Sequence, residues 1–243
     1  MTLSLSRFAP VLGAVCLALS AAAATAQEVR KVKFRTLCLA HAGGVTELAI
    51  PAAKPGQPAV AVPLYTASIS PVIEGSFPTA EAVFHGKAAG PDGKPVVAAR
   101  ATLGKSARQL FFFLPAKEGS PTPYEIRVFD DDTDSFKLGS IRMINLASMP
   151  VRFTLGGDPT PEIAAGQSVI LPQAKKKDEF NMYTVAMELG GADGKWSKAY
   201  SAAWKASKER REIVVTLVDE QFKQPTVKMY SDIPPWTEAG AKP

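Results

Sequence analysis

The sequence predicts an all-β protein made of two tandem immunoglobulin-like antiparallel β-sandwich domains. Three observations carry this prediction. Strand-sized apolar, β-branched or aromatic runs recur along the chain, and turns rich in Gly, Pro and Asp separate them. The 243 residues include 20 Pro and 18 Gly, a content that favours a turn-rich β protein over a helix bundle. Several motifs of the first half recur in the same order in the second half, which indicates an internal duplication.

The apolar runs place the expected strands. In the first half we expect strands near residues 33–39, 46–50, 59–64, 82–85, 96–101, 109–114 and 124–129. In the second half we expect them near residues 140–146, 151–155, 168–171, 183–189, 213–218 and 226–230. Runs of this length at this spacing are typical of antiparallel sandwiches.

One segment of the second half supports two interpretations. Residues 197–212 have the composition of a helix, and Tyr200 and Trp204 lie four apart, as on one helix face. Tyr200, Ala202 and Trp204 also alternate with polar or small residues, as along a strand. We interpret 198–204 as a strand followed by a charged turn, with a helix through residue 212 as the alternative.

The repeated motifs divide the chain. The run 108–114 matches 211–217, and 124–129 matches 227–232. The run 34–39 matches 141–146, and the turn at 92–94 matches the one at 193–195. Offsets of about 101 to 107 residues predict two similar units, at 27–134 and 135–235, followed by a tail at 236–243. The acidic run 130–135 lies between the units, and we expect it to be a solvated turn.

The beginning of the chain has the pattern of a secretory signal peptide. Arg7 precedes an apolar run over 8–24, and Ala24-Thr25-Ala26 is a small-x-small cleavage sequence. We expect residues 1–26 to be removed and the protein to be periplasmic or extracellular. An uncleaved membrane anchor is the alternative. No other stretch approaches the roughly 18 apolar residues that span a bilayer, so we expect no transmembrane segment after cleavage.

Charge and motif content argue against several functions. The net charge of +5 is spread over both halves, without the basic stripe of a nucleic-acid binder. His41 and His85 are the only histidines, and no nucleophile elbow, zinc-binding helix motif or phosphate-binding loop occurs. Cys38 is the one cysteine left after cleavage, and we expect it to be buried. We therefore predict no catalytic residue, no metal and no cofactor.

Aromatic side chains are the remaining candidates for ligand contact. Exposed aromatic rings on a sandwich face can bind sugars by stacking. The candidates are Trp196, Trp204, Trp236 and Tyr200. For each tryptophan the alternative is a packing role, and Trp236 in a Pro-Pro-Trp tail could fold back onto the body as a plug.

A set of spaced residues in the second half resembles a known family. These residues include Gly139, Ser140, Asn145, Trp204 and the terminal sequence Asp232-Ile233-Pro234. They resemble an uncharacterised family of exported β-sandwich proteins of Verrucomicrobia and Planctomycetes. The resemblance implies a sandwich fold, an extracytoplasmic location and no known chemistry. Gly139 and Ser140 suit a tight entry into a strand, and Asn145 can bond to loop backbone.

These observations favour a non-enzymatic exported protein with a binding or scaffolding role in the cell envelope. Its partners would be envelope proteins, because sandwich edges can accept a partner's strand. A carbohydrate- or peptidoglycan-binding module that uses surface aromatics is the alternative. A hydrolase with paired carboxylates is a weaker alternative, and it would need a cleft holding two acidic side chains.

Overall fold

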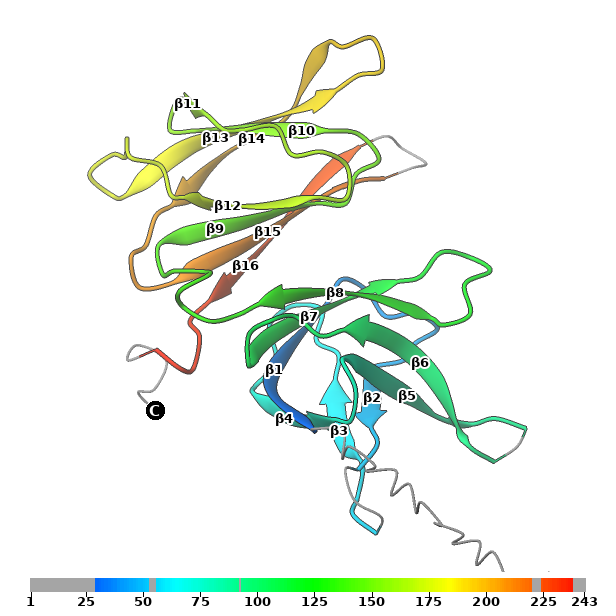
Figure 1. Ribbon diagram of the computed structural model, residues 1–243. Coiled ribbons are helices and arrows are strands. Elements are labelled where there is room, and N and C mark those ends of the chain that lie inside the picture. The colour runs from blue at the N-terminus through cyan, green and yellow to red at the C-terminus, as the bar shows by residue number, and fades with distance from the viewer. Residues whose placement is uncertain (1–28, 53–55, 92, 220–223, 238–243) are drawn as a thin grey trace, which may run out of the picture.

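The computed structural model is all-β over the residues that it describes, which are 29–52, 56–91, 93–219 and 224–237 (Figure 1). It confirms the predicted fold class of two sandwich units. The proposed signal peptide lies outside the described residues. Within them, no helix has the length and apolarity that a membrane crossing requires.

Eight strands form the first unit. They are β1 (Arg30–Cys38), β2 (Glu47–Ile50), β3 (Val60–Pro63), β4 (Ile73–Phe77), β5 (Glu81–Ala89), β6 (Pro95–Thr102), β7 (Arg108–Pro115) and β8 (Tyr124–Asp130). One sheet has the order β4-β1-β7-β8, and the facing sheet has the order β3-β2-β5-β6. All neighbours are antiparallel except β1 and β7, which are parallel.

Eight further strands form the second unit. They are β9 (Ser140–Asn145), β10 (Val151–Leu155), β11 (Asp158–Pro159), β12 (Ser168–Pro172), β13 (Met182–Gly190), β14 (Trp196–Lys205), β15 (Arg211–Val218) and β16 (Pro225–Asp232). The sheet orders are β12-β9-β15-β16 and β11-β10-β13-β14. The parallel pair is β9 with β15. Each strand therefore takes the place of the strand eight labels earlier, so the two units share one topology.

Each unit has its own core between its two sheets. In the first core, Phe34, Phe84, Phe111 and Phe113 pack together, and the ring centroids of Phe84 and Phe111 lie 5.5 Å apart. The second core surrounds Trp204, whose ring lies 6.4 Å from that of Phe153. Cys38 is the one cysteine among the described residues, and it forms no disulfide. Each core is therefore held together by packing.

A third apolar layer joins the two units, and equivalent positions supply both sides of it. Its buried members are Leu37, Leu110, Phe112, Leu114, Phe136, Ile144, Ile213, Val215 and Tyr230. In the matched runs, Leu37 corresponds to Ile144, Leu110 to Ile213 and Phe112 to Val215. The same sheet face of each copy thus packs against the other, as in an isologous dimer. Figure 1 shows the two units one above the other, with β7 and β8 below β15 and β16.

This arrangement explains why most residues of β7, β9 and β15, and the second half of β1, are buried. A sheet with one solvated face alternates apolar and polar residues, whereas a sheet covered on both faces does not. In β7, Phe111 and Phe113 point into the first core, and Leu110 and Phe112 point into the layer between the units. The run 110–114 is therefore buried on both sides.

The expected strands agree well with the observed ones, with two omissions. The ambiguous segment is strand β14, so the strand interpretation of 198–204 is correct. Strand β4 was not expected, because Gly75 interrupts its short apolar pattern and only pairing with β1 holds it in place. The two-residue β11 is too short to give a sequence signal.

The layer between the units should contribute to stability as a core does. Replacing the fully buried Phe112 by Ala is expected to cost about 3–5 kcal/mol of unfolding free energy, through lost transfer energy and a cavity. Chemical denaturation followed by circular dichroism measures this. Val96, which is 46% exposed, is the control, and Val96→Ala should change the free energy by less than about 0.5 kcal/mol. Equal, small effects of both substitutions would contradict a packed layer.

Candidate functional site

Four buried charged side chains meet where the two units join. Arg35 comes from β1, Asp131 follows β8, and Arg211 and Asp232 come from β15 and β16. The guanidinium group of Arg35 donates to Asp131 Oδ2 at 2.9 Å and to Asp232 Oδ1 at 2.6 Å. Arg211 donates from Nε to Asp232 Oδ2 at 2.7 Å and also pairs with Asp131. Two arginines from different units thus share two carboxylates.

Aromatic rings and backbone oxygens complete this charge cluster. The guanidinium carbon of Arg35 lies 4.9 Å from the Trp236 ring centroid, and that of Arg211 lies 4.4 Å from the Phe136 ring centroid. Trp236 Nε1 donates to the carbonyl oxygen of Asp131 at 3.1 Å, and Arg211 Nη1 donates to that of Phe136 at 2.8 Å. Trp236 thus closes the cluster, as expected of a tail that folds back as a plug.

The electrostatics of the cluster favour ion pairing. Burial by itself raises the pKa of Asp232, but the hydrogen bonds and charges of Arg35 and Arg211 outweigh it and hold that pKa below its ordinary value. Burial likewise lowers the pKa of Arg35, and its two carboxylate partners more than reverse this effect. For Asp131 the balance is reversed, because burial raises its pKa and the charges of Arg35 and Arg211 offset this only in part. Both carboxylates nevertheless accept from the same two arginines, so the pair is arranged to hold the units together.

Arg142 is buried beside the cluster without a carboxylate of its own. It is the position in β9 that matches Arg35 of β1. Its Nη2 donates to the carbonyl oxygen of Asp130 at 3.1 Å, and its Nε has no hydrogen-bond partner among the described residues. Burial, and then the charge of Arg211, lower the pKa of Arg142 to about 10. The arginines at equivalent positions therefore have different surroundings in the two units.

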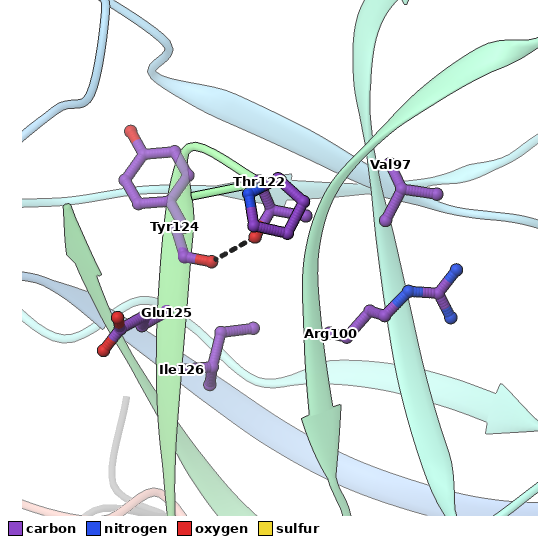
Figure 2. Close-up of a pocket in the computed structure, with 7 residues that line it drawn as sticks. Val97, Arg100, Thr122, Tyr124, Glu125 and Ile126 are labelled. Atoms are coloured by element: carbon purple, nitrogen blue, oxygen red, sulfur yellow. Dashed lines mark hydrogen bonds between the residues drawn. The ribbon is translucent and has the colours of Figure 1, made fainter. Parts of the chain in front are cut away.

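A surface groove lies at the open corner of the first sandwich, between the edge strands β6 and β8. Figure 2 shows Val97 and Arg100 on the β6 side and Tyr124, Glu125 and Ile126 on the β8 side. The groove has a volume of about 560 Å³. Its charges are balanced on the β6 side, because Arg100 donates to Glu81 at 2.8 Å. Tyr124 is its buried lining residue, and the hydroxyl of Tyr124 bonds to the backbone of Ala42 and Val45.

The structure brings three of the four aromatic candidates to one strand. Trp196, Tyr200 and Trp204 all lie on β14, the edge strand of the outer sheet of the second unit. Trp204 is buried in the core, and its Nε1 donates to the hydroxyl of Tyr200 at 3.2 Å. Trp196 is half-buried, and its ring centroid lies 4.4 Å from the guanidinium carbon of Arg152. Trp236, the fourth candidate, lies over the charge cluster instead.

The motif residues of the second half have the folding roles that the sequence suggested. Gly139 adopts a φ of 75°, a left-handed conformation that favours glycine, immediately before Ser140 opens β9. Asn145 ends β9 and is buried, and its Nδ2 donates to the carbonyl oxygens of Met149 at 2.8 Å and Ile163 at 3.0 Å. These contacts fix the loop that follows β9.

The charge cluster is what the sequence reasoning missed. The acidic run 130–135 was expected to be solvated, but Asp131 is only 1% exposed. Asp131 is buried because docking of the second unit brings Arg211 to it and removes water from its carboxylate. The sequence signal was weak, since Arg35 alternates with Lys31 and Lys33 along its strand and Arg211 stands in the charged run 208–212. Nothing in those local patterns separates these two buried arginines from their exposed neighbours.

Other candidate chemistry is sparse in the described part of the chain. Cys38 is fully buried, as expected, and His41 Nε2 lies 2.7 Å from the carbonyl oxygen of Leu64. The described residues hold no cluster of three or more His, Cys, Asp or Glu side chains that could bind a metal ion.

Comparison with known proteins identifies no family or function for this chain. No family model matches the chain, and no curated protein matches it. Among solved structures, one similar chain is a "putative cell adhesion protein" from Bacteroides uniformis, with 10% identity and a TM-score of 0.20. The match covers 86% of this chain and 99% of the other. At that TM-score the likeness supports no argument about function.

The Asp232 carboxylate makes stability depend on pH in the acid range, and the raised pKa of Asp131 acts in the opposite direction. Since the pKa of Asp232 is lower in the folded than in the unfolded protein, its contribution is complete above the ordinary carboxyl pKa of about 3.9 and is lost as the pH falls through the folded value. Asp232→Asn should cost about 3–5 kcal/mol at pH 7, because it leaves two buried arginines with one carboxylate. Urea denaturation from pH 3 to 7 measures both effects.

The matched control for this prediction is an exposed ion pair. Lys33 and Glu74 lie 3.3 Å apart at the surface, so Glu74→Gln should change the unfolding free energy by less than about 1 kcal/mol at every pH. The role given to the cluster is wrong if Asp232→Asn behaves like Glu74→Gln.

The Cys38 thiol should be inert in the folded protein. Burial, only partly offset by a backbone hydrogen bond and by the charge of Lys228, raises its pKa to about 11, so the reactive thiolate is scarce at pH 8. A thiol-specific chromogenic reagent should titrate no thiol in the native protein from Gln27 onward and one thiol in urea. Rapid native reaction would show that the first core opens.

Proposed function

We propose that the protein is a non-enzymatic, exported binding or scaffolding protein of the cell envelope. The observation that carries the proposal is that the four buried charged side chains pair with one another. Arg35 pairs with Asp232 and Arg211 with Asp131 across the junction of the units, and the Arg35–Asp131 and Arg211–Asp232 pairs lie within one unit each. Residues arranged for catalysis normally face a cleft that a substrate can enter. A rigid two-unit body with free sheet edges suits the display of binding surfaces at fixed separation.

The export part of the proposal rests on the sequence pattern alone. The n-region with Arg7, the apolar run and Ala24-Thr25-Ala26 support secretion. Buried Cys38, as the one cysteine after cleavage, is compatible with an oxidising compartment because no exposed thiol remains to be oxidised.

A glycan-binding role is the second candidate, and one observation favours it. Trp196, Arg152 and Glu188 lie close together on the second unit, with Arg152 Nε donating to Glu188 at 2.7 Å. An indole beside a fixed charged pair is a reasonable sugar contact. It is the weaker candidate, because Arg152 already covers part of the Trp196 ring.

Two measurements test the proposal. The full chain expressed in a Gram-negative host should be found in the periplasm with Gln27 at its N-terminus. The purified mature protein, immobilised on beads, should then capture the same envelope proteins from the source organism in repeated trials, and it should not sediment with purified peptidoglycan. Sedimentation with peptidoglycan, lost in Trp196→Ala but not in Tyr65→Ala, would favour the glycan-binding role instead. Retention of the precursor in the cytoplasm would contradict export.

A further inference from the structure

Strand β14 presents a row of free backbone groups. It ends the sheet β11-β10-β13-β14, so only β13 pairs with it. The amide of Ala206 donates to the carbonyl oxygen of Asn181 at 2.8 Å. This bond identifies which residue pairs between β13 and β14 are hydrogen-bonded and which are not. Bonded and non-bonded pairs alternate in antiparallel strands. The N–H and C=O groups of Ser201 and Ala203 therefore point away from β13, and they bond to no other described residue.

An apolar seam runs beside this free edge. Strands β14 and β16 belong to opposite sheets and approach each other at the corner of the sandwich. Tyr200 and Ala202 of β14 and Val227 of β16 are partly buried there against the second core. Met229, paired with Val214 on the same inner face, is 39% exposed. A strand added to β14 would lay every second side chain on this seam.

Positive charge borders the outer face of the edge. Lys198 and Lys205 lie near its two ends, both exposed, and neither forms an ion pair with another described residue. Opposite charges on neighbouring strands attract each other. The edge therefore suits an acidic strand.

We propose that β14 accepts an extended, acidic segment of a partner protein as an added strand. The segment would alternate apolar residues, which face the Tyr200–Met229 seam, with residues on the outer face that include carboxylates near Lys198 and Lys205. This inference rests on the proposed binding function and names its partner class.

The equivalent edge of the first unit lacks this chemistry. Strand β6 matches β14 in the topology, and its charged edge residue Arg100 is already paired with Glu81 at 2.8 Å. The backbone of Arg100 also points away from β5, since the amide of Leu103 bonds to Ala80 at 2.8 Å. Strand β6 is therefore an internal control, with the same edge geometry and a neutralised charge.

A designed peptide tests the proposal on the mature chain. The probe is a ten-residue peptide of alternating Val and Glu with blocked ends, and the comparison peptide alternates Val and Lys. Nuclear magnetic resonance of ¹⁵N-labelled protein should show amide shifts at Ser201 and Ala203 with the acidic peptide, and slower amide exchange at both. The basic peptide should bind at least about tenfold more weakly, because two charge pairs change sign.

Two variants make the test specific. Ala203→Pro removes an outward N–H without breaking a ladder bond, and it should abolish binding. Arg100→Pro removes the equivalent outward N–H on β6, together with the exposed Arg100–Glu81 ion pair, and should leave binding intact. Lys198→Glu combined with Lys205→Glu should reverse the peptide preference, whereas Lys31→Glu combined with Lys117→Glu should not. Binding that survives Ala203→Pro, or shifts confined to other strands, would overturn the proposal.

The envelope capture experiment separates this inference from the broader function. Loss of the captured proteins in Ala203→Pro, but not in Arg100→Pro, supports strand addition at β14. Equal capture by both variants refutes the β14 site and leaves the binding function standing. No reproducible capture even by the unsubstituted protein refutes the binding function itself.

Discussion

The sharing of two buried carboxylates by two arginines is the interaction on which the arrangement of this molecule depends. Arg35 belongs to the first unit and Arg211 to the second, and each binds both Asp131 and Asp232. A buried charge is costly unless it is paired. Separating the units would break the Arg35–Asp232 and Arg211–Asp131 pairs and would also expose the apolar layer around Phe112. The ion pairs and the apolar layer therefore act together to hold the two sandwiches against each other.

The interface buries the same sheet face of both units. This face is apolar in each, and an isolated unit would expose it to water. Packing it against the equivalent face of the other unit removes that surface, as a symmetric dimer does. The two units nevertheless differ around it. Arg35 holds two carboxylates, whereas its counterpart Arg142 stacks on Phe129 and Phe136.

The rigid body has consequences for binding. Since one face of each unit is used internally, what remains for partners is the outer sheets, the corners and the sheet edges. Edge strands must also be kept from pairing at random, and lysines are a common means of doing so. On β14, Lys198 and Lys205 carry such charges, and the same two lysines would attract an acidic strand.

The candidate surfaces were only partly visible in the sequence. Alternation at Tyr200, Ala202 and Trp204 was enough to predict strand β14, because side-chain direction follows local geometry. The sequence could not show that this strand lies at a sheet edge, since that depends on which distant strands pair. Nor could it separate the buried indole of Trp204 from the half-buried Trp196 on the same strand.

By itself, then, the sequence determined the fold class, most strands and the repeat of units, because apolar periodicity and turn residues are local signals. The tertiary structure decided the rest. It turned Asp131 from an expected solvated residue into a buried ion-pair partner, since Arg35 and Arg211 lie far from it along the chain. It also placed Trp236 over those charges. Such contacts arise only when two sheets dock, and no local pattern encodes which ones meet.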